Sequence, residues 1–380
     1  MVQSDNSYAA RPPRRVLIIL LGAIGDVVRA LPLLGRMRRG WPEAHIAWAV
    51  EPKSQPVLER HPWLDELIVY ERRRAPWSFA PFLGKIRRGR FDLVLDLQRH
   101  LKRGLISLVS RAPDRIGFAA ANTKEWNHRF STRRIAPQPR MRLKLAQYQA
   151  FADALDLPET PIEFGLQLSG DEAARALAHL EGLPRPLLGV ILGSSWPSRI
   201  YFPEAVAAAV RDLAAANGAA PLTPILIGGP EDAALGAAVM RELDGVGARD
   251  LTGRTGLRDL IAIFGECAAA FGPDCGPMHI AAAAGCPIVS LWGSTAPERS
   301  APWGNAHLAM RGEIPCHPCY LRECPIEREC MRRIAPAGVA ALVRRALQER
   351  RPRGPSGLAK NRGGGAAAGA PAAGAHPERS

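Results

Sequence analysis

The strongest constraint on the fold is an alternation of short apolar runs with amphipathic stretches, which occurs twice along the chain. In the first series, β-branched residues and leucines fill the runs 16–21, 45–50 and 92–97, and apolar residues recur with helical spacing in 26–39 and 101–110. Continuous apolar runs of this length are typical of strands that are buried on both faces. Such strands, separated by helices, predict a parallel sheet of the α/β class.

A second series of similar size follows. Its expected strands and helices lie at 187–192, 203–215, 224–227, 231–243, 268–271, 278–284, 287–292 and 336–350. Two series predict two Rossmann-like doubly wound domains, over residues 15–160 and 186–350, with a linker at 161–185. We expect residues 1–14 and 351–380 to be disordered. The C-terminal stretch consists mainly of Gly, Ala, Pro and Arg and offers almost no large apolar side chain to bury.

Composition narrows the class of protein further. No apolar run reaches the roughly 18 residues that a membrane-spanning helix needs, and the first residues lack the apolar centre of a secretory signal. Seven cysteines among 380 residues are too few for a disulfide scaffold. We therefore expect a cytoplasmic protein in a reducing compartment, and we exclude an integral membrane protein and a small disulfide-rich secreted one.

The positive charge of the chain is concentrated in its first part. Residues 1–150 contain 28 Lys and Arg against 12 Asp and Glu, whereas residues 151–350 contain 17 against 23, and the whole chain carries +14. A basic half predicts an anionic partner, which could be a nucleic acid, an anionic membrane surface or a phosphorylated substrate. A solvated arginine-rich surface would give the same count.

The loop after the first expected strand contains Gly22, Gly25 and Asp26. Ligands of doubly wound sheets bind at the carboxyl ends of strands, so the cleft between two such domains is the predicted site. The glycines allow a ligand to approach the backbone, and Asp26 could be either a helix cap or a general base. Glu51 resembles the ribose-binding acid of a nicotinamide oxidoreductase, but the G-x-G-x-x-G fingerprint is absent, which leaves that enzyme class a weaker alternative.

Five segments together resemble glycosyltransferase family 9, the ADP-heptose:lipopolysaccharide heptosyltransferases and their relatives, over about residues 15–335. They are RVLIILLGAIGDVVRALPLL, HPWLDELIVYER, DLVLDLQ, RIGF and FGPDCGPMHIAAAAGCPIVSLWGSTAPERSAPWG. The resemblance implies a GT-B architecture, with the acceptor on the N-terminal domain and the nucleotide-sugar on the C-terminal one. It implies an inverting, metal-independent transfer of heptose from ADP-heptose to a lipopolysaccharide inner-core acceptor, without a cofactor. Asp26 would then be the catalytic base. A relative that uses another nucleotide-sugar is the alternative.

Three loops of the second half follow expected strands and precede helices, where hydroxyls and free N–H groups suit a phosphate. Together with the resemblance they predict the donor-binding residues Ser194, Ser195, Arg199, Glu231, Asp274, Gly276 and His279. Arg199 stands where the family commonly has lysine, and Cys275 where it usually has Ser or Thr. Each side chain also has a plain structural interpretation: a surface charge for Arg199, a helix cap for Glu231 and a core histidine for His279.

The basic half supplies the expected acceptor side. Gly25, Arg103 and Arg115 are predicted to contact the anionic glycolipid, and Arg99 and Lys102 are further candidates. Three further groups could rest on the cytoplasmic face of the inner membrane in a transient, peripheral association: the arginines 72–74, the arginines 87, 88 and 90, and the neighbouring aromatic residues Trp77, Phe79 and Phe82. A nucleic-acid-binding α/β protein would also explain the charge, but no recognised nucleic-acid-binding motif is present.

Four cysteines follow one another closely near the end of the second domain. The set Cys316, Cys319, Cys324 and Cys330 could bind structural zinc, form a redox-sensitive or disulfide-linked loop, or pack as reduced thiols. The spacing of the second pair is irregular for a zinc site. No metal is predicted to take part in the reaction.

Overall fold

The computed structural model describes residue 8 and residues 11–72, 77–215 and 221–349, except for the side chains of residues 102 and 103. The predicted disordered segment 351–380, and most of 1–14, fall outside the described residues. Tyr8 is described: its hydroxyl donates a hydrogen bond to Asp114 at 2.8 Å, and its ring meets Trp41 edge-on. No helix among the described residues is both long enough and apolar enough to span a bilayer.

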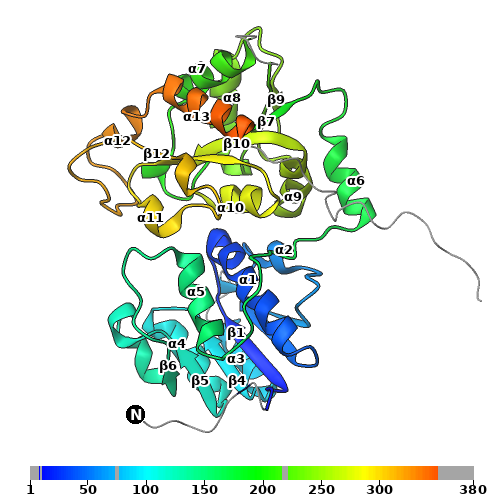
Figure 1. Cartoon of the computed structure of the whole chain (residues 1–380), viewed down its shortest axis with the longest axis vertical. Helices are drawn as coiled ribbons and strands as arrows, with labels where there is room; N and C mark the ends of the chain where they lie inside the picture. The colour runs from blue at the N-terminus through cyan, green and yellow to red at the C-terminus, as the bar shows by residue number, and fades with distance from the viewer. Residues whose placement is uncertain (1–7, 9–10, 73–76, 216–220, 350–380) are drawn as a thin grey trace, which may run out of the picture. The chain divides into compact units, whose positions relative to one another are not determined.

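The first sheet belongs to a part of the chain that we call the N-lobe, which contains β1–β6 and α1–α5 (Figure 1). Its six strands are parallel and lie in the order β3-β2-β1-β4-β5-β6. The strands are β1 Arg15–Ile19, β2 His45–Val50, β3 Glu66–Val69, β4 Leu93–Asp96, β5 Asp114–Gly117 and β6 Arg133–Arg134. The helices are α1 Ile24–Gly40, α2 Gln55–Leu58, α3 Phe79–Arg88, α4 Leu101–Ser110 and α5 Lys144–Asp153.

The second sheet belongs to the C-lobe, which contains β7–β12 and α6–α13. Its six parallel strands lie in the order β12-β11-β10-β7-β8-β9. The strands are β7 Leu187–Ile191, β8 Thr223–Ile227, β9 Arg249–Asp250, β10 Cys267–Pro273, β11 Ile288–Trp292 and β12 Ala309–Arg311. The helices are α6 Gly170–Ala178, α7 Pro203–Ala214, α8 Ala233–Glu242, α9 Leu257–Glu266, α10 Gly276–Ala283, α11 Pro297–Ser300, α12 Glu329–Arg332 and α13 Pro336–Gln348.

Both sheets are doubly wound, which confirms the predicted α/β fold class with two Rossmann-like sheets. The strand order reverses between β1 and β4 in the N-lobe and between β7 and β10 in the C-lobe. The loops that follow such neighbouring strands diverge and leave a crevice at the carboxyl ends of the strands. The candidate site is therefore expected in the loops after β1 and β7.

Strand β1 shows why the apolar runs are continuous. Val16 and Ile18 pack into a core with α1, whereas Leu17 and Ile19 face a second core on the other side of the sheet, with Ile86 of α3. Because helices cover both faces of the sheet, all four side chains are fully buried. Polar and apolar residues therefore do not alternate along the strand.

The two lobes meet at the N-terminal ends of α1 and α10. The helices contact each other, and Ile24 of α1 belongs to the same apolar core as Met278 of α10. This contact brings the loop after β1 close to the loop after β10, and the candidate site is built around it.

Several observed elements, such as β3, α3, α5 and α9, have no counterpart among the predicted ranges. Among the predicted elements, the differences lie mainly at their ends. The stretch predicted as a helix at 231–243 divides into a short 3-10 turn, Pro230–Asp232, and α8. The predicted linker 161–185 includes α6, which packs against α9. A capping box at Ser169 and Glu172 begins this helix, and that signal is visible in the sequence.

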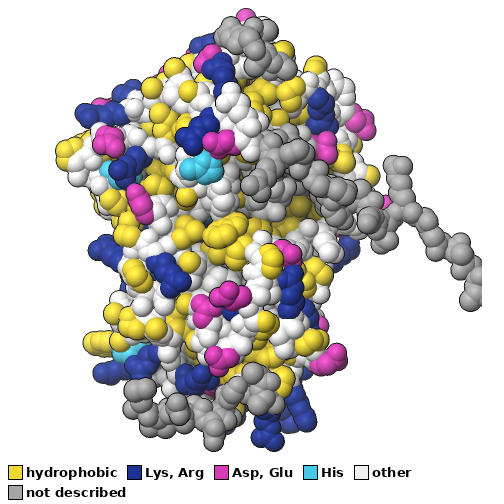
Figure 2. Space-filling model, viewed as in Figure 1, with side chains coloured by type: hydrophobic (Ala, Val, Ile, Leu, Met, Phe, Trp, Pro, Cys, Tyr) yellow, Lys and Arg dark blue, Asp and Glu magenta, His cyan; other side chains and the backbone are white. Residues whose placement is uncertain are grey.

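Basic side chains are not confined to the N-lobe surface. On the face shown in Figure 2, Lys and Arg side chains occur over both lobes, with acidic side chains among them. Two N-lobe arginines are instead buried or half-buried around the meeting point of the lobes: Arg29 and Arg99.

Candidate active site

A cavity of about 610 Å³ lies at the carboxyl ends of the strands, where loops of both lobes converge. The N-lobe contributes the loops after β1 and β2, and the C-lobe contributes the loops after β7, β8 and β10 together with the start of α9. This volume is in the range of small-molecule and nucleotide sites. Its position agrees with the crevice expected from the strand order.

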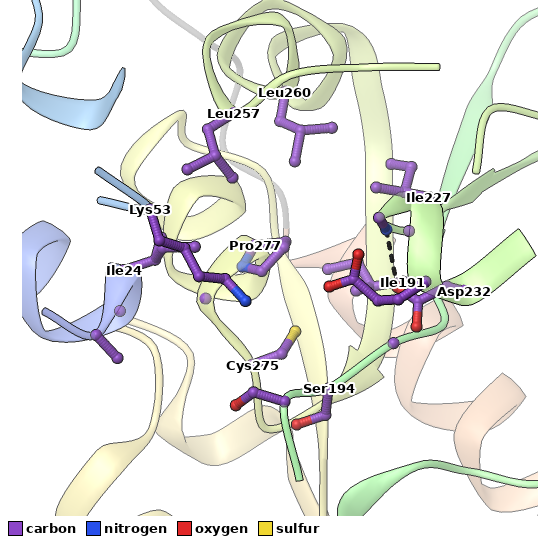
Figure 3. A pocket seen from close by; sticks show the side chains of 18 of the residues that line it. Ile24, Lys53, Ile191, Ser194, Ile227, Asp232, Leu257, Leu260, Cys275 and Pro277 are labelled. Carbon is purple, nitrogen blue, oxygen red and sulfur yellow. Dashed lines mark hydrogen bonds between the residues drawn. The ribbon is translucent and has the colours of Figure 1, made fainter. Parts of the chain in front are cut away.

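The lining combines apolar walls with a few polar groups. Figure 3 shows Leu257 and Leu260 on one wall, and Lys53 reaching into the cavity from the N-lobe with its ammonium group toward the C-lobe loops. The sulfur of Cys275 also points inward. Apolar walls with few polar groups suit a flat aromatic ring that carries a polar or charged substituent.

Four of the predicted donor residues line this cavity: Ser194, Ser195, Glu231 and Gly276. The Ser194 hydroxyl donates to the backbone carbonyl of Asp274 at 2.9 Å, which ties the loop after β7 to the loop after β10. Lys53, Leu257 and Leu260 were not predicted. Lys53 lies in the loop after β2, two residues after Glu51. Because ligands bind at the carboxyl ends of strands, this position could have been predicted from the sequence.

The alternative role of Glu231 as a helix cap is taken by its neighbour. The Asp232 carboxylate accepts a hydrogen bond from the Gly229 backbone N–H at 2.8 Å and so caps the turn. Burial raises the pKa of Asp232, and the Gly229 N–H and Lys53 oppose this shift. Glu231 thus remains a lining residue of the cavity.

Asp274 and Arg199 are not among the residues that line the cavity, and they pair with each other. An Arg199 Nη1 atom is 3.1 Å from Oδ2 of Asp274, and the Thr295 hydroxyl donates to the same carboxylate at 2.7 Å. The Arg199 guanidinium also stacks over the ring of Trp196 at 4.0 Å. Arg199 is thus a half-buried, paired cation next to the donor loops rather than a surface charge.

Asp26 does not cap its helix, contrary to one of the two predicted roles. Ala23 is the N-cap residue of α1, and Asp26 lies in the first turn. One oxygen of the Asp26 carboxylate accepts from Nη2 of Arg29 at 2.6 Å and from Nζ of Lys144, on α5, at 2.7 Å. Burial by itself would raise the pKa of Asp26, but the charges of Lys144 and Arg29 outweigh it and hold the pKa far below the usual value. Asp26 is therefore ionised.

Lys144 is the partner of Asp26 that sequence reasoning missed. Burial lowers the pKa of Lys144 to about 8, and the attraction of Asp26 opposes that shift. The two residues are 118 positions apart, and no pattern in the sequence pairs them. Tyr148, one turn later on α5, also contacts Asp26.

His279 faces the N-lobe instead of the cavity lining. Its Nε2 atom lies 2.6 Å from Nη1 of Arg29, which also donates to the Ser300 carbonyl at 3.3 Å. A guanidinium can only donate, so Nε2 accepts and the imidazole is neutral. Burial, and then Arg29, lower the pKa of His279 well below its usual value. In this structure the His279 imidazole is therefore a neutral bridge between the lobes.

The two glycines of these loops serve the contact between the lobes. A Cβ atom on Gly25 would lie 2.5 Å from Cδ2 of His279, and one on Gly276 would lie 2.8 Å from Cβ of Ile24. Separations this short do not occur between real side chains, so both positions require glycine in this arrangement. Gly25 also lines the cavity.

A group of cations surrounds Asp26 and Asp274. The positive charge of Arg299 lowers the pKa of Lys144 and of Arg99, and the charge of Arg29 lowers the pKa of Arg199. These side chains therefore lie within reach of one another's charge. Within the described residues, the Nε atoms of Arg29, Arg199 and Arg299 are buried without a hydrogen-bond partner. Five cations face two carboxylates here, so this region is suited to bind an anion. We call the group Arg29, Arg99, Lys144, Arg199 and Arg299 the cation cluster.

The predicted acceptor residue Arg115 is bound within the N-lobe and does not line the cavity. Arg115 donates from Nε to the Phe130 carbonyl at 2.9 Å and from Nη1 to the Ala112 carbonyl at 2.7 Å. These bonds hold the end of α4 and the loop before β6, which is a structural role. The side chain of Arg103 lies outside the described residues.

The four clustered cysteines were considered as a zinc site. All seven are free, and no group of three or more metal-binding side chains is arranged for an ion in the part of the chain that the structure describes. Cys316 is exposed whereas Cys330 is buried, so the four thiols lie at different depths.

The chain is similar to known glycosyltransferases. A family model described as glycosyltransferase family 9 (heptosyltransferase) matches residues 81–329. The lipopolysaccharide core heptosyltransferase OpsX of Haemophilus influenzae is 25% identical over 302 residues, which cover 77% of this chain and 83% of that protein.

Two solved structures share the fold. A glycosyl transferase family 9 protein from Veillonella parvula has a TM-score of 0.73 at 21% identity, covering 89% of this chain and 98% of that one. The ADP-heptose LPS heptosyltransferase II of Escherichia coli has a TM-score of 0.69 at 22% identity, covering 88% and 99%. The family model spans well over half of the chain, and the two facing Rossmann-like sheets match GT-B structures. The protein therefore belongs to glycosyltransferase family 9 and is a GT-B glycosyltransferase.

Proposed function

We propose that this enzyme transfers a heptose from ADP-heptose to the inner core of a lipopolysaccharide acceptor, with inversion of the anomeric centre and without a metal ion. The names of the relatives support the substrate class, since they are lipopolysaccharide heptosyltransferases and one names ADP-heptose. The observation that carries the proposal is the ionised Asp26 next to a nucleotide-sized cavity and within a cluster of cations.

The donor nucleotide occupies the cavity in this proposal. The adenine ring packs against Leu257 and Leu260, and the Glu231 carboxylate accepts hydrogen bonds from the nucleoside. The diphosphate lies at the N-terminal end of α10, near the Ser194 and Ser195 loop, where free N–H groups and hydroxyls can donate. Lys53 adds a positive charge from the opposite lobe.

Asp26 acts as the base. The acceptor hydroxyl attacks the anomeric carbon from the side opposite the departing diphosphate, and its proton passes to the Asp26 carboxylate as the bond to the leaving oxygen breaks. A carboxylate with so low a pKa is a weak base, so the proton transfer accompanies bond cleavage rather than preceding it. One carboxylate on the attacking side and a leaving group on the other produce inversion.

The cation cluster stabilises negative charge in the place that a divalent metal occupies in other enzymes. Fixed cations in a site that excludes water stabilise charge as it develops on the leaving diphosphate. The cluster also suits the phosphate and carboxylate groups of an inner-core acceptor. An acceptor embedded in a lipid leaflet further implies a cytoplasmic enzyme with peripheral contact to the membrane.

The direct test is transfer to a heptose-free inner-core glycolipid. We expect mass spectrometry to show the gain of one heptose with ADP-heptose, and NMR of the product to show inverted anomeric configuration. Turnover should be unchanged by EDTA. Transfer only from a UDP-sugar would support the alternative donor, and a thermal shift with NAD but not with ADP would overturn the assignment of the cavity.

Removing the Glu231 carboxylate should weaken nucleotide binding. We expect Glu231→Ala to raise the Kd for ADP at least about tenfold, because a hydrogen bond to a charged group is lost in the cavity. Calorimetric titration with ADP measures the effect. Glu242→Ala, at an exposed position on α8, is the matched control and should bind ADP like the wild type. Equal affinity of the two variants would remove Glu231 from the nucleotide site.

Lys144 should support turnover without contributing to ADP affinity. In Lys144→Ala, Asp26 keeps only Arg29 as an ion-pair partner. The pKa of Asp26 then rises, because burial is opposed by one cation instead of two. The carboxylate is also held less firmly in position. We expect kcat to fall about tenfold, and Lys144→Arg to recover part of it. Lys124→Ala, an exposed N-lobe control, should be unaffected. A change in ADP affinity but not in kcat would contradict this role.

A further inference from the structure

The outer surface of α4 exposes a stripe of leucines. Leu101, Leu105 and Leu108 are all exposed and recur at the spacing of one helix face, although the opposite face already contributes the buried Ile106 to the N-lobe core. A surface helix of a protein that meets only water normally has a polar outer face. Helix α4 is therefore apolar on two sides, and the leucines of its outer side stay exposed.

Tryptophan side chains flank this stripe. Trp126, 67% exposed, immediately precedes the 3-10 turn Asn127–Phe130, which packs against α4. The neighbouring Glu125 accepts a hydrogen bond from the Leu101 N–H at 3.3 Å, so Trp126 lies near the start of α4. Trp77, 86% exposed, stands just before α3, which packs beside α4. Phe79 and Phe82, predicted to face outward with Trp77, instead pack on Tyr70, and Phe82 is buried.

A second cavity, of about 500 Å³, lies at the other end of the same two helices. Its lining contains no acidic residue. It consists of Phe91, Ser110 and four arginines: Arg87, Arg88, Arg90 and Arg111. All four arginines are exposed. Arg111 directly follows the last residue of α4, so the leucine stripe continues into the arginine cavity. We call this surface, from Trp126 along the leucines to the four arginines, the α3–α4 face.

We propose that the α3–α4 face docks on an anionic lipid bilayer, with the leucines and tryptophans in the interfacial layer and a lipid phosphate in the arginine cavity. Tryptophan is enriched at membrane interfaces, and clustered basic residues bind anionic headgroups. A nucleic acid would bind the arginines through its phosphates but would make no favourable contact with the exposed leucines. Arginines and exposed leucines on one face therefore favour a membrane. The inference rests on the proposed function, whose acceptor is a lipid, and it names the surface that brings the enzyme to that lipid.

Vesicle sedimentation tests the proposal without requiring sugar transfer. Full-length protein is incubated with vesicles of phosphatidylcholine alone or of phosphatidylcholine mixed with phosphatidylglycerol. We expect at least about tenfold stronger binding to the anionic vesicles, since several arginines contribute. Equal binding to both kinds of vesicle would overturn the proposal.

Two double variants separate the contributions of charge and apolar contact. Arg87→Glu/Arg88→Glu and Leu105→Gln/Leu108→Gln should each weaken binding to anionic vesicles about tenfold or more. The matched controls are Arg175→Glu/Arg241→Glu and Leu321→Gln/Ile326→Gln, which alter exposed C-lobe residues of the same types. Vesicle binding by these controls should equal that of the wild type. Controls as weak as the face variants would show a non-specific effect and overturn the proposal.

Two further measurements distinguish membrane binding from sugar transfer. Turnover with a soluble, delipidated acceptor should be the same in the face variants and the wild type, whatever sugar is transferred. Binding to DNA or RNA duplexes that depends on Arg87 and Arg88 but not on Leu105 and Leu108, together with weak vesicle binding, would assign the face to nucleic acid instead. Failure of sugar transfer with intact vesicle binding would overturn only the proposed function.

Discussion

Asp26→Asn lowers kcat at least about a hundredfold, the usual cost of removing a general base, while the Kd for ADP stays near the wild-type value. The amide keeps the size of the carboxylate but cannot accept the proton of the attacking hydroxyl. It also leaves Arg29 and Lys144 without the negative partner that both now share. The measurement is the rate of ADP release with saturating donor and acceptor, beside a calorimetric titration with ADP.

A matched control for this change is Asp156→Asn. Asp156 is exposed on the same lobe and has a left-handed backbone, which asparagine also adopts readily. Its kcat should equal that of the wild type. If Asp26→Asn turned over at the wild-type rate, Asp26 would be reduced to holding Arg29 and Lys144, and another base would have to be sought.

Gly25→Ala has the second largest expected effect, because it tests whether the lobes must meet as closely as the structure has them. The new methyl group would lie 2.5 Å from the His279 ring, which is buried and tied through Nε2 to Arg29. The ring has little room to move, so α1 and α10 have to separate. We expect kcat to fall at least about tenfold, since Asp26 then moves away from the donor, whereas ADP binding, which relies mainly on C-lobe loops, changes little.

A compensating substitution distinguishes this steric cause from general damage. In Gly25→Ala/His279→Ala the obstructing ring is absent, so activity should exceed that of Gly25→Ala alone. Gly170→Ala is the control, since a Cβ there meets nothing within 4 Å. A fully active Gly25→Ala enzyme would show that the close approach of α1 and α10 is not needed for turnover.

Local pattern and tertiary structure contributed differently to the site. The strand-end loops that contain Gly25, Ser194 and Glu231 were predictable, because an apolar run followed by a glycine-rich turn and a helix is a local signal. The cap at Asp232, one residue from the predicted Glu231, shows the limit of that signal. Which of two adjacent carboxylates turns back to the Gly229 N–H is decided by backbone geometry.

The sequence by itself determined the two parallel sheets, the loops at their carboxyl ends and the family, because each depends on residues that are near one another in the chain. Only the tertiary structure decided the surroundings of Asp26. Lys144 and His279 reach Asp26 and Arg29 from helices 118 and 250 positions away, and one of these helices belongs to the other lobe. The ionisation of a buried group depends on charges that are close in space, and hydrophobic spacing contains no information about which distant cation will be brought there.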